Sequence, residues 1–282
     1  MKTAPGEPRP FLRWAGSKRQ LVPRLRQMWS DGFERYYEPF MGSACLFFAL
    51  RPRQAVLSDL NKELVDAFIQ VRDHHVAVSR RLSTLKVGKD AYYHLRAVDP
   101  AHLAPVEAAA RFIYLNRFSF NGLFRTNLSG QFNVPFCPTG TGRAPTLDDL
   151  ARCATLLKRA VLRHGDFSES LEDVREKDFV YLDPPFAVRG RRVFREYCAG
   201  SFGPDDLIRF TLELKRLDLL GARFVVSYAD CPEGRAALKD WHVVRVRTRR
   251  NIAGFSKHRR HAYELLASNV EPVAAGKEKY RE

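Results

Sequence analysis

The sequence predicts an α/β protein with a mostly parallel sheet, and three observations point to that class. Short apolar segments alternate with amphipathic helical stretches along much of the chain. A glycine turn follows the first apolar segment, and an acidic residue ends the second. Strand, glycine turn, helix, strand and acid is the usual beginning of a nucleotide-binding α/β unit.

The elements of this first unit lie close together near the N-terminus. Residues 35–40 are expected to form a strand that runs into the glycine turn. Residues 44–50 then begin a helix, and residues 55–57 form a buried strand that ends at Ser58 and Asp59. This order places an acid at the carboxyl end of a parallel strand, where ligands bind in open α/β sheets.

The middle of the chain has a different pattern. Helical periodicity covers residues 61–85 and 106–115, and the stretch between them, 86–105, is expected to be irregular because prolines interrupt it. Residues 117–143 are rich in Phe, Asn, Gly and Arg and have no helical period. Because residues 128–131 also have turn chemistry, this segment predicts a hairpin or a long binding loop.

The second half returns to alternating helices and strands. The expected helices cover 147–159 and 205–219, and the expected strands cover 160–164, 179–182, 224–227, 241–246 and 262–267. Repeated alternation favours a mostly parallel sheet, into which residues 62–145 are inserted as a mainly helical region.

Composition limits the class of protein. Of the 282 residues, 45% are hydrophobic and 28% charged, which is typical of a globular domain. We expect no membrane contact and a cytoplasmic location, because the chain has neither a long apolar run nor the apolar core of a signal peptide. The five cysteines form no CxxC pair and His74-His75 has no ligand cluster beside it, so we expect no disulfide framework and no metal site.

The net charge of +15 predicts a polyanionic partner. Three stretches carry basic residues without a single acid: six Lys or Arg in 8–30, three in 117–143 and seven in 243–263. Acids gather elsewhere, as in 169–178. A generally Arg-rich composition does not require this segregation, which favours a basic face for nucleic acid.

The segment Asp183-Pro184-Pro185-Phe186 directly follows an expected strand. An exocyclic base amine is a weak nucleophile, because its lone pair is delocalised into the ring. The Asp183 carboxylate and the Pro184 carbonyl can accept hydrogen bonds from such an amine, two prolines stiffen the turn, and Phe186 offers a face for an extruded base. The alternative is an ordinary loop at a strand end, but ligands bind at that end of parallel strands.

Two other segments suit a small cofactor. Gly42 lets the backbone approach a ligand closely, and Asp59 is placed to accept hydrogen bonds from ribose hydroxyls. The chain has no G-x-G-x-x-G, which argues against a dinucleotide. Trp14 and Lys18 flank a small-residue turn that could hold a sulfonium carrying a carboxylate. Taken singly, an ordinary tight turn and a packed tryptophan explain these residues equally well.

Two motifs in the middle region carry a family resemblance. Residues 115–125 read Leu-Asn-Arg-Phe-Ser-Phe-Asn-Gly-Leu-Phe-Arg, and residues 130–136 read Gly-Gln-Phe-Asn-Val-Pro-Phe. Both resemble the signature of the Dam-type, D12-class DNA adenine-N6 methyltransferases. The resemblance extends from about residue 10 to 268, with the cofactor segments, the recognition region and the catalytic segment in the family's order.

The resemblance implies a Rossmann-like methyltransferase fold with an inserted, mainly helical and hairpin DNA-recognition domain. Residues 8–61 and 146–270 would form the catalytic domain, 62–145 the recognition domain and 271–282 a tail. It also implies S-adenosylmethionine as methyl donor and duplex DNA as substrate, methylated at adenine N6, commonly within GATC. We expect a monomer, with a cognate restriction nuclease as a potential partner.

The resemblance also assigns roles to residues. The catalytic residues would be Asp183, Pro184, Pro185 and Phe186. The cofactor would contact Trp14, Lys18, Phe40, Gly42, Asp59, Asp166, Phe167 and Asp183. The DNA would contact Arg13, Phe120, Asn121, Leu123, Arg125, Pro135, Arg249 and Lys257. Among these, Phe120 and Asn121 match positions where the target base leaves the stack, and Arg125 suits bidentate contact with guanine.

The sequence departs from the family pattern at three positions. Ala44 replaces the second glycine of F-x-G-x-G, Ser17 replaces a glycine of W-A-G-G-K, and Phe186 stands where tyrosine is usual. A side chain at position 44 is expected to avoid positive φ and to crowd the methionine end of the cofactor. Stacking on Phe186 does not need the tyrosine hydroxyl.

Two rival functions stay open from the sequence. A DNA-binding protein that kept the fold and lost methyl transfer is one, and Ala44 is its best support. An amine methyltransferase acting on cytosine N4, RNA or protein glutamine is the other, against which the hairpin motifs and the segregated basic residues argue.

Overall fold

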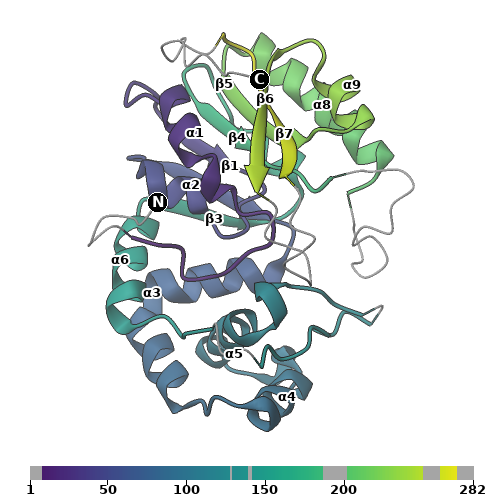
Figure 1. Cartoon of the computed structure of the whole chain (residues 1–282). Helices are drawn as coiled ribbons and strands as arrows, with labels where there is room; N and C mark the ends of the chain where they lie inside the picture. Colours follow the sequence, from purple (N-terminus) through teal and green to yellow (C-terminus); the bar gives the residue numbers. More distant parts are fainter. Residues whose placement is uncertain (1–7, 128, 139–141, 187–201, 250–260, 272–282) are drawn as a thin grey trace.

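The computed structural model describes residues 8–127, 129–138, 142–186, 202–249 and 261–271 (Figure 1). Its strands form one seven-stranded sheet in the order β3-β2-β1-β4-β5-β7-β6. The strands are β1 (Tyr36–Glu38), β2 (Ala55–Asp59), β3 (Ala160–His164), β4 (Phe179–Leu182), β5 (Arg223–Ala229), β6 (His242–Arg249) and β7 (His261–Ser268). The first five pair in parallel, and β7 and β6 pair antiparallel at one edge, which confirms the expected mostly parallel sheet.

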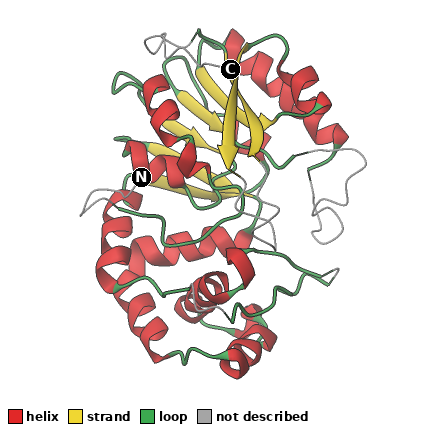
Figure 2. Ribbon diagram, in the orientation of Figure 1, coloured by secondary structure: helices red, strands yellow, loops and turns green. Residues whose placement is uncertain are grey.

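Helices cover both faces of the sheet and extend below it (Figure 2). They are α1 (Val22–Met28), α2 (Cys45–Leu50), α3 (Lys62–Thr84), α4 (Lys89–Ala97), α5 (Pro105–Phe118), α6 (Leu147–Leu157), α7 (Phe167–Leu171), α8 (Pro204–Leu219) and α9 (Pro232–Leu238). Short 3-10 turns are η1 (Lys18–Gln20), η2 (Pro100–His102) and η3 (Phe120–Gly122). None of the helices in these described stretches has the length and apolarity to cross a membrane.

Alternate residues of the central strands enter two different cores. In β4, Val180 and Leu182 pack with Phe210 and Leu214 of α8, whereas Tyr181 faces the opposite core. All four residues of β4 are buried, as expected of a strand in a parallel sheet that is covered on both faces.

Side chains cap the first turns of α3 and α6. The Asn61 side chain accepts a hydrogen bond from the backbone N–H of Leu64 at the start of α3. Thr146 and Asp149 form a reciprocal capping box at the start of α6. Caps of this kind satisfy backbone donors that a helix leaves unpaired, so they fix where each helix begins.

The region between α3 and α6 differs from the expectation at one place. Residues 86–105 were expected to be irregular, but they contain α4 and η2. Pro100 and Pro105 both lie in the first turn of a helix, where the missing N–H costs nothing, so these prolines begin helices rather than interrupt them. Helix α4 also supports the loop that follows α5, because the Tyr92 hydroxyl donates a hydrogen bond to the Val134 carbonyl at 3.0 Å.

The expected hairpin after α5 is present. The backbone N–H of Asn127 donates to the Gln131 carbonyl at 2.8 Å, and Thr126 and Phe132 form an antiparallel bridge. At its base, the N–H of Phe120 donates to the Pro135 carbonyl at 2.9 Å. We call residues 119–136 the hairpin loop.

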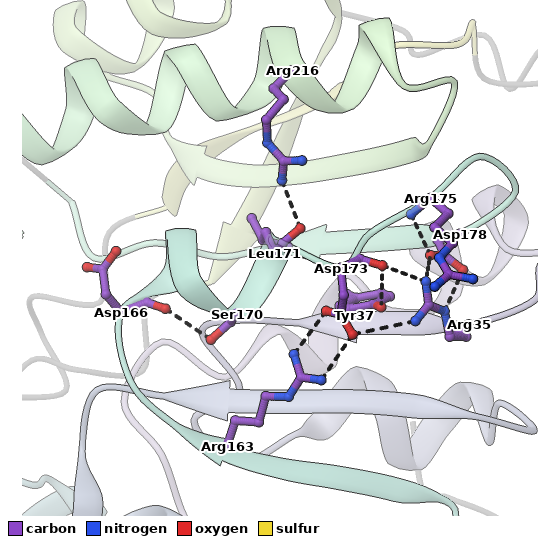
Figure 3. Close-up of polar contacts among 10 residues, drawn as sticks. All are labelled: Arg35, Tyr37, Arg163, Asp166, Ser170, Leu171, Asp173, Arg175, Asp178 and Arg216. Carbon is purple, nitrogen blue, oxygen red and sulfur yellow. Dashed lines mark hydrogen bonds and ion pairs between the residues drawn. The ribbon is translucent and has the colours of Figure 1, made fainter.

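An ion-pair network ties the loop before β4 to the residue that precedes β1 and to β3 (Figure 3). Arg35, just before β1, donates two hydrogen bonds to Asp178, which is 1% exposed. Arg163 of β3 donates two more to Asp173, whose side chain is 40% exposed. Arg35 also donates to the Asp173 carbonyl at 2.7 Å, which joins the two pairs.

Replacing the two arginines should have unequal effects on stability. Arg35→Ala leaves the buried carboxylate of Asp178 without its cation, and we expect a loss of about 3 kcal/mol in the free energy of unfolding. Arg163→Ala removes the partner of a solvent-exposed carboxylate, and we expect a loss of roughly 1 kcal/mol or less. Urea unfolding of both variants measures the difference, and equal losses would contradict this account.

Candidate active site

Residues that follow three neighbouring strands meet at the carboxyl edge of the sheet. Phe40 and Gly42 come after β1, Asp59 ends β2, and Asp183 comes directly after β4. In the sheet, β1 lies between β2 and β4, so these residues share one edge. Ligands bind at such edges because the loops there diverge.

An ammonium group lies between two carboxylates at this edge. Lys18 Nζ is 3.0 Å from Asp183 Oδ1 and 3.4 Å from Glu264 Oε2, and the Lys18 side chain is only 5% exposed. Burial lowers the pKa of Lys18, but the two carboxylates outweigh that effect and raise it above its ordinary value, so the group stays a cation. Lys18 Nζ also lies 5.1 Å from the centre of the Phe186 ring.

The sequence predicted Lys18 and Asp183 as site residues but missed their ion pair and missed Glu264. Glu264 comes from β7, and its second oxygen accepts a hydrogen bond from the Thr248 hydroxyl at 3.2 Å. No local pattern marks Glu264, because its role depends on strand pairing between residues far apart in the chain.

Among the described residues, the Asp183 carboxylate is held on one of its two oxygens. Lys18 Nζ and the Ser227 hydroxyl both contact Oδ1, the latter at 2.9 Å. Burial raises the pKa of Asp183 above its ordinary value, and Lys18 and Ser227 offset part of this increase. Neither of these two contacts within the described part of the chain involves Oδ2.

Gly42 lies beneath Trp14. The backbone N–H of Gly42 donates to Asp59 Oδ2 at 3.0 Å, and the N–H of Asn61 donates to Oδ1 at the same distance. Gly42 has a φ of +45°, and a Cβ built there would lie 2.6 Å from Trp14 Cδ1. Only glycine therefore allows this close packing.

Ala44 corrects an expectation from the sequence. A side chain at this position was expected to avoid positive φ, yet Ala44 has φ 50° and ψ 37° and precedes the first turn of α2. The methyl group is fully buried in the core with Leu46 and Phe47. This backbone conformation costs a residue with a Cβ about 1–2 kcal/mol, which the surrounding core offsets.

The predicted pair Asp166 and Phe167 lies beside Phe40. The rings of Phe40 and Phe167 stack with centroids 5.4 Å apart. Asp166 accepts from the backbone N–H of Ser168 at the start of α7 and pairs with Arg209 of α8, which the sequence did not single out. Burial raises the pKa of Asp166, but its hydrogen bonds with Ser168 and Arg209 bring it below the ordinary value.

The hairpin loop lies against the N-terminal segment. Asn116 of α5 is 1% exposed and accepts from the Arg13 backbone N–H at 2.8 Å, while its amide donates to the Arg13 carbonyl at 2.6 Å. The same amide contacts the Gly122 carbonyl at 3.3 Å. Trp14 stacks on Phe124 with ring centroids 5.9 Å apart. The segment that carries Lys18 is thus joined to the loop by one buried amide and one aromatic contact.

The other predicted DNA-contacting residues differ in exposure. Phe120 is 39% exposed, and Asn121 next to it has a positive φ of 56°. Leu123 is partly buried and packs on the core. Arg125 Nε donates to Asn133 Oδ1 at 2.7 Å across the hairpin.

The remaining predicted residues are less fully described. Pro135 is exposed, and its carbonyl accepts from Phe120 as described above. The backbone of Arg249 ends β6, whereas its side chain and the whole of Lys257 lie outside the described residues. Within the portion of the chain that is described, no cluster of His, Cys, Asp or Glu could hold a metal ion.

Comparisons with known proteins agree on one family. The profile described as D12 class N6 adenine-specific DNA methyltransferase matches residues 14–252. The type II methyltransferase M1.LlaDCHI of Lactococcus lactis subsp. cremoris is 30% identical over 273 residues, which cover 93% of this chain and 95% of the relative. The type II methyltransferase M.MjaIII of Methanocaldococcus jannaschii is 31% identical, with coverage of 78% and 84%.

A third relative is named as an adenine methylase. The DNA adenine methylase of Escherichia coli (strain K12) is 29% identical over 272 residues, which cover 92% of this chain and 94% of the relative. These matches confirm the family expected from the hairpin motifs.

Gly42→Ala tests the packing of Trp14 against the glycine turn. We expect it to destabilise the chain by about 1–2 kcal/mol through its positive φ, and by a further 1–3 kcal/mol through displacement of the indole. Gly130→Ala is the matched control, because Gly130 has a φ of +76° but no atom within 4 Å of a built Cβ. Thermal unfolding of both variants gives the comparison, and an equal loss in both would show that the indole contact contributes nothing.

Proposed function

Because this chain belongs to the D12 class N6 adenine-specific DNA methyltransferases, we propose that it methylates adenine N6 in duplex DNA with S-adenosylmethionine as donor. Asp183, Pro184, Pro185 and Phe186 form the proposed catalytic segment. The observation that carries the proposal is the Asp183 carboxylate at the end of β4, where the contacts described above hold Oδ1 and leave Oδ2 as an acceptor.

The chemistry of the donor set at the sheet edge fits S-adenosylmethionine. An ammonium has three N–H donors, of which Lys18 directs two toward Asp183 and Glu264, so one can bind the cofactor's carboxylate. The two carboxylates exceed the one ammonium by a single negative charge, which suits a sulfonium cation. When bound, the cofactor supplies an electrophilic methyl carbon.

The cofactor's nucleoside suits the other residues at this edge. The Asp59 carboxylate accepts backbone hydrogen bonds from Gly42, Asn61 and Leu60, and its two oxygens have about four acceptor positions in all, so it can also accept from a ribose hydroxyl. The stacked rings of Phe40 and Phe167 offer an apolar wall for adenine. We therefore assign Asp59, Phe40 and Phe167 to the nucleoside, and Trp14 and Gly42 to the turn that closes over it.

Asp183 and the Pro184 carbonyl act on the target amine. Each accepts one hydrogen bond from N6, which withdraws the lone pair from the adenine ring and turns it toward the methyl donor. The prolines fix the direction of both acceptors before the base arrives. Phe186 stacks on the extruded base, and this contact offsets part of the few kcal/mol that base flipping costs.

The hairpin loop is the proposed reader of the DNA sequence. Phe120 is exposed at the base of the loop, where it can enter the space that a flipped base leaves. Arg125 matches the position that contacts guanine, and Asn133 holds its guanidinium from across the hairpin. With Arg13, Asn121, Leu123 and Pro135, this loop supports GATC as the methylated site.

Two observations argue against the rival functions. Membership of an adenine-specific DNA methyltransferase family argues against cytosine N4, RNA or protein glutamine as the acceptor. A non-catalytic protein rested on Ala44, which adopts the left-handed backbone conformation despite its side chain.

Asp183→Ala should reduce methyl transfer by about 1000-fold, because it removes the acceptor that activates N6. DNA binding should stay within a few fold of wild type, since Lys18 retains Glu264 as a partner. Asp173→Ala, at an ion-paired aspartate in the loop before β4, is the control. Transfer of radiolabelled methyl groups and a DNA gel shift measure the two properties. Full methyl transfer by Asp183→Ala would refute the assignment.

Expression in a methylation-free host tests the base and the site together. Long-read sequencing of the host DNA should show N6-methyladenine at GATC, and a nuclease that cuts only unmethylated GATC should leave plasmid intact. DNA from cells that express Asp183→Ala is the negative control. Methyladenine at another sequence would overturn the site while leaving the reaction in place, and methylated cytosine would overturn both.

A further inference from the structure

We propose that Ser227 is a positioning residue that, held by Tyr181, fixes the rotation of the Asp183 carboxylate. The proposal rests on the proposed function of Asp183. Ser227 belongs to β5, next to β4, and the pairing of Leu182 with Val226 brings the following residues, Asp183 and Ser227, side by side. Ser227 is 0% exposed, and its hydroxyl donates to Asp183 Oδ1 at 2.9 Å.

The direction of this hydrogen-bond chain follows from the number of hydrogens. A serine hydroxyl has one hydrogen, and Ser227 uses it on the acceptor-only carboxylate of Asp183. The Tyr181 hydroxyl lies 2.9 Å from Ser227 Oγ and must therefore be the donor to it. Burial raises the pKa of Tyr181 well above its ordinary value, which keeps this donor protonated.

A carboxylate needs such a constraint. Rotation about the Cβ–Cγ bond of aspartate is soft and roughly two-fold, so a single contact does not decide which oxygen faces the substrate. Lys18 provides one contact, but from a flexible stem. Ser227 and Tyr181 stand on two paired strands of the sheet, so their contact is rigid, and it selects Oδ2 for the target amine.

Neighbouring ionisable groups affect the pKa of Asp183. The ionisable groups that face it are Lys18 of η1, Glu264 of β7, Tyr181 of β4, Glu38 of β1 and Cys45 of α2. Ser227 stabilises the ionised form, so its loss raises the pKa of Asp183 further. Because transfer needs the ionised carboxylate and fails as pH falls through that pKa, the acid limb of activity should move to higher pH.

Ser227→Ala is the first test. The lost hydrogen bond to a charged group predicts a fall in kcat of about 10-fold to 100-fold. The Kd for S-adenosylmethionine and the KM for DNA should stay within about threefold, and the acid limb of kcat should shift upward. Ser268→Ala is the control, because Ser268 is also a fully buried serine of the sheet and bonds only to the local Val270 N–H among the contacts described.

A second variant separates positioning from folding. Ser227→Ala leaves the buried Tyr181 hydroxyl without its partner, whereas Tyr181→Phe with Ser227→Ala removes both hydroxyls. The double variant should fold, and it should still show the low kcat and the shift of the acid limb of kcat to higher pH. Wild-type kcat and pH profile in the folded double variant would overturn the proposal. If Asp183→Ala is inactive in the same assay, such a result refutes only the role of Ser227 and leaves the proposed function intact. If Asp183→Ala is active, the proposed function and the role of Ser227 are both refuted.

Discussion

The charge balance around Lys18 is the constraint on which this site depends. A buried ammonium requires anionic partners, and Asp183 and Glu264 bring the end of β4 and the middle of β7 toward the N-terminal segment. The three residues come from distant parts of the chain, so they meet only when the N-terminal segment, β4 and β7 have taken their places in the fold.

Charged side chains are arranged differently at the amino and the carboxyl ends of the parallel strands, which we call the amino and carboxyl edges of the sheet. At the amino edge, Arg35 and Asp178 form a paired and satisfied network that fixes the loop before β4. At the carboxyl edge, two carboxylates face one cation, which leaves an excess of one negative charge among these three groups. Apolar strands separate the two edges, so each keeps its own electrostatic character.

Local sequence patterns predicted the strands and the segment after β4, because apolar runs and proline-rich turns are visible in neighbouring residues. Glu264, Ser227 and Arg209 could not be predicted from local patterns. Only the packing of strands and helices brings them to Lys18, Asp183 and Asp166, respectively. The helix α4 was missed because prolines begin helices as well as interrupt them. The backbone at Ala44 was misjudged because a buried methyl group can offset the strain.

The amide of Asn116 has a consequence for exchanging the hairpin loop between relatives. It holds the backbone of Arg13 on one side and the Gly122 carbonyl on the other, and a Cβ on Gly122 would lie 2.5 Å from the Cβ of Arg13. Two segments more than a hundred residues apart in the chain therefore form one rigid surface. A transplanted hairpin loop would fit a foreign scaffold only if residues 11–14 moved with it.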